Sequence, residues 1–114
     1  MNDQFIEEMF DNLKKRINIS ENKSYTAHLI NNPEFLAKKI GEESSELIID
    51  FIKKNKIGIV KESADLIYHL LVLWISSGVD PQDIWKELSS RKIKTGFEEK
   101  NSRGLKNEQK LRQK

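Results

Sequence analysis

The sequence predicts an all-α fold, an antiparallel helical bundle in a single domain. Apolar residues recur at the three- and four-residue spacing of amphipathic helices, and no segment has the clear alternation of a half-buried strand. Prolines and a glycine fall where helices should begin and end. A chain of 114 residues with 37% hydrophobic content can build one core but is poor in apolar material, so we expect a second subunit to complete the bundle.

The first predicted helix covers residues 3–17, where the apolar side chains form one stripe. Residues 18–32 follow, are rich in Asn, Ser and Thr, and contain the segment SYTAHL at 24–29. We interpret this stretch as a loop with about one helical turn. Long loops in compact domains often carry function, so this stretch is a candidate for substrate contact.

The second and third predicted helices form a pair. The second covers residues 33–54 and begins with Asn32 as its N-cap and Pro33 at the first helical position. A turn at residues 55–58 leads into the third helix at 59–77, whose second half is apolar nearly all round and should be central. Such a short connection makes the two helices antiparallel neighbours.

A fourth helix should follow directly. Gly78 is a natural stop for the third helix, because glycine readily adopts the left-handed conformation found after helix ends. Asp80, Pro81 and Asp83 then mark the next helix start. We expect this last helix to extend to Lys92.

Charge is unevenly distributed along the chain. The net charge is +2, but residues 91–114 carry nine basic and three acidic side chains, which leaves the preceding part with a net charge of −4. We place the domain at residues 1–104 and interpret residues 105–114 as a disordered basic tail, because they contain too little apolar surface to offset the entropy of ordering. No nucleic-acid partner is expected, since the body is acidic and no aromatic residues are interleaved in the tail.

Composition also bears on the compartment. The chain has no cysteine, which excludes a disulfide scaffold and thiolate chemistry and fits a reducing cytosol. Its acidic, amphipathic start is unlike a signal peptide, and its longest apolar run is about half of the roughly 20 residues that a membrane span needs. We therefore expect a soluble, cytoplasmic protein without a membrane partner.

Acidic side chains fall in two clusters, one on the second and one on the third predicted helix. Helical geometry puts Glu46 on one stripe with Glu42 and Glu43, and puts Glu62 beside Asp65. If the helices pack antiparallel, both stripes can face one groove, and like charges brought together there must protonate, move apart or bind a cation. A solvated acidic helix face is the alternative.

The ligand types indicate which cation would bind. Carboxylates without Cys and without a Glu-x-x-His pattern favour Mg²⁺, with Mn²⁺ as the other choice, over zinc or a di-iron centre. Mg²⁺ shares its shell with phosphate oxygens and water, which fits attack on the α-phosphorus of a polyphosphate and release of pyrophosphate. Lys38, Lys39 and Lys61 lie close in sequence and could contact phosphates, although each also fits a solvated helix surface.

The acidic clusters belong to a longer pattern. Residues 42–46 read EExxE, and a gap of 15 residues separates them from ExxD at 62–65. This spacing resembles the signature of the MazG-like all-α nucleoside-triphosphate pyrophosphatases. Within that group the chain is most similar to the phosphoribosyl-ATP pyrophosphatase family, whose sequence blocks resemble SYTAHL, KKIGEESSEL, ESADLIYHLLVLW, GVDPQDIWKEL and GFEEKNSRG in that order. The resemblance covers about residues 5–104.

The resemblance implies a specific reaction. It is the hydrolysis of 1-(5-phosphoribosyl)-ATP to 1-(5-phosphoribosyl)-AMP and pyrophosphate, the second step of histidine biosynthesis, with Mg²⁺, in the cytoplasm, by a homodimer or a larger homo-oligomer. The same resemblance implies that the metal ligands are Glu43, Glu46, Glu62 and Asp65. Glu42 matches the remaining acid of the family, as ligand or as general base.

Further residues are candidates for substrate contacts. Ser24 and Tyr25 could close over the ribose or the base, although an N-cap explains Ser24 equally well. Lys39 is the lysine that we assign to the phosphates. Phe97 could anchor the segment GFEEKNSRG and so bring Arg103 to a phosphate, which a guanidinium binds in bidentate fashion.

Two other functions remain open at the level of sequence. The first is a house-cleaning hydrolase of ordinary or damaged nucleoside triphosphates with the same acidic residues; SYTAHL and the Tyr68 and His69 pair argue against it, because the generic motif does not require them. The second is a non-enzymatic helical dimer that binds nucleic acid through its tail. His69, four residues after Asp65, is interpreted as a core histidine that is hydrogen-bonded through one ring nitrogen.

Overall fold

The computed structural model describes residues 4–92, and this part of the chain is helical without any strand. The finding confirms the predicted all-α class. The chain divides after Pro81 into two compact units, the first of which holds the acidic clusters. The predicted domain limit at residue 104 and the predicted tail at 105–114 lie outside the described residues. The helices are α1 (Phe5–Lys14), α2 (Tyr25–Asn31), α3 (Pro33–Ile52), α4 (Lys56–Ser77) and α5 (Pro81–Arg91).

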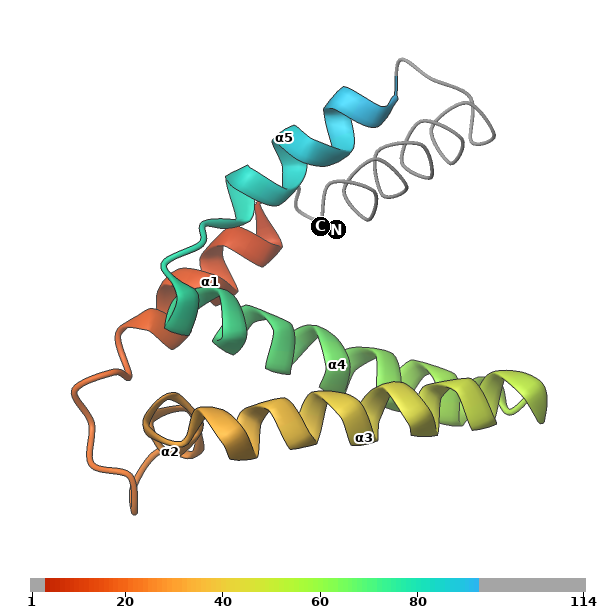
Figure 1. Ribbon diagram of the computed structural model, residues 1–114, viewed down its shortest axis with the longest axis horizontal. Coiled ribbons are helices and arrows are strands. Elements are labelled where there is room, and N and C mark those ends of the chain that lie inside the picture. Colours follow the sequence, from red (N-terminus) through yellow and green to blue (C-terminus); the bar gives the residue numbers. More distant parts are fainter. Residues whose placement is uncertain (1–3, 93–114) are drawn as a thin grey trace, which may run out of the picture. The chain divides into compact units, whose positions relative to one another are not determined.

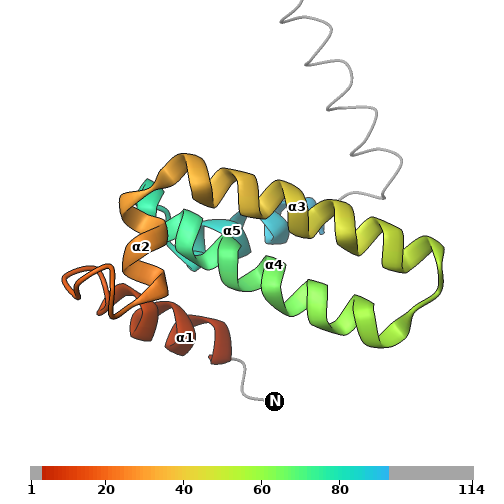
Figure 2. The same cartoon turned by 90° about the horizontal axis from the view of Figure 1, so that it is seen from below.

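Helices α3 and α4 form an antiparallel hairpin, as predicted, and lie side by side along most of their length (Figures 1 and 2). The end where α3 begins and α4 finishes is called the near end here. The end with the connecting turn is called the far end. The two ends differ in what covers them.

The connecting turn at the far end is tighter than predicted, because α4 begins at Lys56 instead of residue 59. Asn55 is the N-cap of α4, and its Oδ1 accepts a hydrogen bond of 3.2 Å from the Gly58 amide, so Gly58 belongs to the first helical turn. Lys54 ends the preceding helix with a left-handed φ of 59°. The Lys54 and Asn55 amides donate to the Phe51 and Asp50 carbonyls at 3.1 and 2.9 Å, which satisfies the last carbonyls of α3.

The near end of α4 stops in the same way but with glycine. Gly78 has a φ of 70°, and the amide of Val79 donates to the Trp74 carbonyl at 2.9 Å. The predicted stop at Gly78 is therefore confirmed. The left-handed conformation after the helix has little steric cost for glycine, since glycine has no Cβ to clash with the following carbonyl oxygen.

Helices α1 and α2 cover the near end of the hairpin (Figure 2). The side chains that meet there form the core of the first unit and come from all four helices of that unit. Half-buried apolar side chains, among them Ile40, Tyr68 and Trp74, pack around this core. The buried core residues are Phe10, Leu13, Leu29, Leu36, Leu71 and Val72.

The N-terminal region departs from the prediction at two points. Helix α1 ends at Lys14 instead of residue 17. The backbone after it forms tighter hydrogen bonds between residues three apart, such as that from the Ile17 amide to the Lys14 carbonyl at 3.3 Å, and Ile17 is exposed. The stretch expected to be a loop with about one turn contains α2, a seven-residue helix. Burial of Leu29 and Ala27 stabilises this short helix, which local sequence alone would not.

Asn32 occupies the position before α3, as predicted, but its side chain does not cap that helix. Its Nδ2 instead donates to the Glu21 carboxylate at 2.8 Å and to the His28 carbonyl at 2.7 Å. Asn32 thus joins the connection before α2 to the end of α2. The predicted Pro33 start of α3 is confirmed without that capping bond.

The far end of the hairpin is apolar and exposed. The exposed fractions of Phe51, Ile52 and Ile57 are 71%, 71% and 75%, and Val60 is 69% exposed. Neither α1 nor α2 reaches these side chains. We refer to Ile48, Phe51, Ile52, Ile57 and Val60 as the far-end patch.

Helix α5 opens with Pro81 and has Asp83 in its first turn, as predicted, and ends at Arg91, one residue before the predicted end. Within it, Arg91 forms an ion pair with Glu87 at 3.1 Å. Among the described residues, no helix is both long enough and apolar enough to cross a membrane.

Candidate functional site

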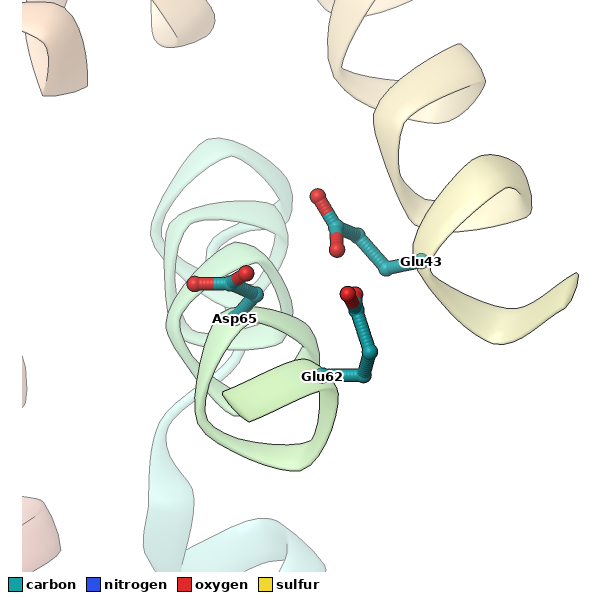
Figure 3. Close-up of side chains that lie close together, drawn as sticks. All are labelled: Glu43, Glu62 and Asp65. Carbon is teal, nitrogen blue, oxygen red and sulfur yellow. The ribbon is translucent and has the colours of Figure 1, made fainter. Parts of the chain in front are cut away.

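The acidic clusters meet between α3 and α4. Glu43 comes from the middle of α3, and Glu62 and Asp65 come from the facing turns of α4, so that the three side chains lie close together between the helices (Figure 3). One oxygen from each of the three residues lies within 4.8 Å of the others. We call these three residues the acidic group. The antiparallel hairpin brings them together as the sequence periodicity predicted.

Burial makes this arrangement costly in the absence of a counter-charge. Glu43 is only 7% exposed, and Oε2 of Glu62 is buried without a hydrogen-bond partner as long as its neighbours are ionised. A buried carboxylate oxygen without a donor loses its hydration and gains nothing in return. A proton or a cation at this position would remove that cost.

Glu46 extends the acidic group along α3. A hydrogen bond to Glu62, followed by the charge of Glu62, raises the pKa of Glu46 above its usual value. The pKa of Glu62 is raised as well, first by a hydrogen bond with Glu43 and then by burial. Carboxyls can hydrogen-bond to each other only when one holds a proton, so both shifts have the same cause: negative charges are crowded between the two helices.

Glu42 is not a member of the acidic group. Its carboxylate forms ion pairs with Lys39 at 3.7 Å and with Lys38 at 4.0 Å along the surface of α3. Its charge still reaches Glu46, whose pKa it helps to raise. The structure therefore separates Glu42 from the acidic group, a division that the EExxE spacing did not reveal.

Helix α2 brings the SYTAHL segment to the same face of the hairpin. Ser24 is buried and caps α2, since its Oγ accepts a hydrogen bond of 3.2 Å from the Ala27 amide. Tyr25 follows directly and is 47% exposed. Its hydroxyl lies 3.5 Å from Nε2 of His69, one helical turn after Asp65, so the phenol lies close to the part of α4 that carries the acidic group.

Polar contacts fasten α2 to α4 next to these carboxylates. Thr26 Oγ1 and the Tyr68 hydroxyl lie 2.6 Å apart, and the Tyr25 hydroxyl lies 3.5 Å from Nε2 of His69. The Nδ1 of His69 is 2.7 Å from the Asp65 carbonyl oxygen, and His69 is 5% exposed. His69 is thus the buried, hydrogen-bonded histidine that the sequence predicted.

The contact between Tyr25 and His69 was not predicted. It joins residues that are 44 positions apart in the chain, and no local spacing could signal it. The occurrence of both in motif segments was the only hint. Arg103, the remaining predicted substrate contact, lies outside the described residues.

The donor set suits a hard divalent cation. Three carboxylates from two helices converge, and Oε2 of Glu62 is buried without a hydrogen-bond partner. Mg²⁺ and Mn²⁺ bind such oxygen ligands and leave part of their shell to phosphate and water. The residues present therefore fit the cation that the sequence indicates.

Comparison with known proteins identifies the family of this chain. A sequence profile of the phosphoribosyl-ATP pyrophosphohydrolase family matches residues 6–92, which include every described helix that contributes to the site. The chain belongs to this family. The resemblance read from the motifs is thereby confirmed.

Individual relatives of the phosphoribosyl-ATP pyrophosphohydrolase family span nearly the whole chain. The phosphoribosyl-ATP pyrophosphatase of Paramagnetospirillum magneticum is 39% identical over 104 residues, which are 90% of this chain and 95% of the relative. That of Saccharolobus solfataricus is 41% identical over 93 residues, 81% of this chain and 99% of the relative. That of Azospirillum brasilense is 35% identical over 99 residues, 86% and 89% of the two chains.

Proposed function

We propose that this chain hydrolyses 1-(5-phosphoribosyl)-ATP to 1-(5-phosphoribosyl)-AMP and pyrophosphate, the second step of histidine biosynthesis, in the cytoplasm. The acidic group between α3 and α4 is the observation that carries the chemistry, because converging carboxylates with an orphaned oxygen suit a cation that holds a polyphosphate. Membership of the phosphoribosyl-ATP pyrophosphohydrolase family supports the choice of substrate.

In this proposal Glu43, Glu62 and Asp65 hold Mg²⁺, or Mn²⁺ in its place, and Glu46 completes the ligand set through its contact with Glu62. When bound, the cation neutralises the crowded carboxylates and polarises the phosphate to be attacked. A water oxygen forms a bond to the α-phosphorus, the bond from that phosphorus to the bridging oxygen breaks, and pyrophosphate leaves with the bridging oxygen.

The attacking water must lose a proton, and we assign its acceptance to Glu42. This carboxylate lies on the same helix as Glu43 and Glu46 but outside the acidic group, which is the position that a proton acceptor needs. Lys39, which pairs with Glu42, is the proposed phosphate contact on this helix. Tyr25 is the proposed contact to the nucleoside, with Ser24 as the cap that sets its helix. Arg103 remains a proposed phosphate contact from sequence alone.

A homodimer forms part of the proposal. The far-end patch is apolar, and neither α1 nor α2 covers it, whereas Leu71 on the second half of α4 is already buried within the chain. We therefore locate the subunit contact at the far end of the hairpin. In a two-fold dimer both copies use the same patch, so each of its side chains would be buried once in each subunit.

The substrate is tested by pyrophosphate release. Purified protein is assayed with phosphoribosyl-ATP, ATP and the four dNTPs, each with Mg²⁺ and with a chelator. We expect turnover of phosphoribosyl-ATP to dominate and to require the cation. A preference for dNTPs would instead support the house-cleaning hydrolase, and no turnover of any nucleotide would support a non-enzymatic role.

The ligand and base assignments are tested by a matched pair of variants. Glu62→Gln should abolish turnover and also abolish the rise in melting temperature that Mg²⁺ produces in the wild type, because a ligand is lost. Glu42→Gln should lower kcat by roughly 10²–10⁴-fold, the usual range for general acid–base catalysis, and keep that Mg²⁺-dependent rise. If Glu42→Gln also lost the rise, Glu42 would belong to the ligand set.

A further inference from the structure

We propose that His69 is a positioning residue, which orients the Tyr25 phenol so that its oxygen accepts a hydrogen bond from a ribose hydroxyl of the substrate. The inference rests on the proposed function, because it names the substrate group that this part of the site would recognise. It concerns a pair of residues that links α2 to the helix with two of the three members of the acidic group.

The first step is the position of the ring proton on His69. Its Nδ1 lies 2.7 Å from the Asp65 carbonyl oxygen. A carbonyl oxygen only accepts hydrogen bonds, so Nδ1 must carry the hydrogen. An imidazole with a single ring proton then presents Nε2 as an acceptor. The helix carbonyl four residues earlier in α4 therefore fixes both the orientation of the ring and its tautomer.

The second step is the proton of Tyr25. Its hydroxyl lies 3.5 Å from Nε2 of His69, and the two rings meet edge to face at 6.1 Å. Because Nε2 accepts, the phenol must donate. Burial is the main cause that raises the pKa of Tyr25, and the negative charges of Glu43 and Asp65 add to it despite the opposing charge of Lys39, so the phenol keeps this proton.

The consequence concerns what the phenol can still bind. A phenol has one hydrogen to donate, and here His69 receives it, so the oxygen can only accept from the substrate. Phosphate oxygens are acceptors and are excluded as partners. The ribose is joined directly to the α-phosphate, and its hydroxyls are the donors closest to the bond that breaks. Tyr25 is half exposed, and His69 joins its hydroxyl to the turn of α4 that carries Asp65, so a ribose hydroxyl can reach the phenol when the acidic group holds the phosphates.

His69 itself acts only through Tyr25. It is 5% exposed, and both of its ring nitrogens are occupied within the protein, by Asp65 and by Tyr25. A direct contact to the substrate is therefore excluded. Without the Nε2 acceptor, the Tyr25 hydroxyl could rotate and donate its hydrogen to the substrate. The site would then no longer prefer a ribose hydroxyl as the partner of Tyr25.

Two substitutions of His69 separate its two hydrogen bonds. His69→Asn keeps a donor near the Asp65 carbonyl but has no acceptor at the Nε2 position. His69→Gln places a carboxamide oxygen near that position and restores the acceptor. For phosphoribosyl-ATP we expect His69→Asn to raise KM roughly fivefold with little change in kcat, the effect of one neutral hydrogen bond, and His69→Gln to return KM close to the wild-type value.

The double variant shows whether His69 works through Tyr25. Tyr25→Phe should raise KM by a similar factor, and adding His69→Asn to it should cause no further increase. Independent, multiplying effects of the two substitutions would overturn the proposal. Competitive inhibition by ATP, 2′-deoxy-ATP and 3′-deoxy-ATP identifies the substrate group: the wild type should discriminate against at least one deoxy analogue, and Tyr25→Phe should not. Equal inhibition of the wild type by all three would refute the ribose contact.

A measurement without substrate separates this inference from the proposed function. In the metal-free protein, ¹⁵N resonances of the His69 ring should show the hydrogen on Nδ1, and Tyr25→Phe should shift the Nε2 resonance. A hydrogen on Nε2 would overturn the inference even if phosphoribosyl-ATP is the substrate. Tyr68→Phe is the matched control, because it removes the 2.6 Å contact to Thr26 between the same helices and should lower stability without changing KM.

Discussion

The two ends of the α3–α4 hairpin carry similar apolar side chains that differ in burial. At the near end, Leu36 and Leu71 are buried under α1 and α2, whereas at the far end Phe51 and Ile57 stand in solvent. Helical periodicity is the same at both ends, so the difference comes from what packs there. Within the first unit, the short helices α1 and α2 pack against the near end only. The difference teaches that intrachain packing buries the apolar side chains of one end and leaves those of the other end available for the proposed subunit contact.

The largest effect is expected at the far end. Phe51→Ser should weaken the proposed homodimer by about 3–6 kcal/mol, since a buried Phe contributes about 1.5–3 kcal/mol and the substitution occurs in both copies. The dissociation constant should therefore rise by about 10²–10⁴. Light scattering over a dilution series measures this. Ile19→Ser, at another exposed apolar side chain, is the control and should leave assembly unchanged.

At the near end, a substitution should destabilise the folded monomer. Leu71→Ala removes a fully buried side chain from the core and should lower the free energy of unfolding by about 2–5 kcal/mol. Ile57→Ala is the far-end counterpart and should change the stability of the monomer by less than about 0.5 kcal/mol. Urea denaturation at concentrations below the dimer dissociation constant measures both. Equal losses at the two ends would contradict the comparison.

The acidic group between the two ends should respond to pH. Glu46 and Glu62 have folded-state pKa values raised above the ordinary 4.5, so the folded protein holds protons that the unfolded chain has released. The stabilisation from these protons is complete below the unfolded pKa and is lost as pH rises through the folded pKa. Without divalent cations, the contribution of these groups to stability should therefore increase as pH falls from neutral toward the ordinary pKa of 4.5.

Glu46→Gln sharpens that expectation. The variant should be as stable as the wild type or more stable at neutral pH without Mg²⁺, since one crowded charge is gone, and its stability should depend less on pH. Its activity should be lost. Thermal melts at several pH values, with and without Mg²⁺, measure these effects. Glu34→Gln, at an exposed carboxylate in the first turn of α3, is the control and should not alter the response to Mg²⁺.

The smallest effect concerns how the helices end. Lys54 and Gly78 both adopt a left-handed conformation, with φ of 59° and 70°, but only the glycine does so without steric cost. Lys54→Gly should raise stability by about 0.5–1 kcal/mol, and Gly78→Ala should lower it by about 1–2 kcal/mol. No atom lies within 4 Å of a Cβ built at Gly78, so the cost there is that of the backbone alone. Calorimetry measures both shifts.

The sequence by itself determined the four longer helices, α1, α3, α4 and α5, and the acidic stripes. Pro33, Pro81 and Gly78 mark helix ends through their own backbone preferences, and the spacing of Glu43, Glu62 and Asp65 places them on facing stripes once a short turn makes the helices antiparallel. These features depend on residues close together in the chain. They were therefore predictable, apart from shifts of a few residues such as the earlier start of α4 at Lys56.

Only the tertiary structure decided which residues of the sequence motifs come together in space. Glu42 is next to Glu43 in sequence yet turns to Lys38 and Lys39, because a helix presents consecutive residues on different faces. Helix α2 exists because its apolar side chains are buried against distant residues, and His69 meets Tyr25 across 44 positions of chain. Burial and long-range contact depend on how helices pack, and no local pattern contains that information.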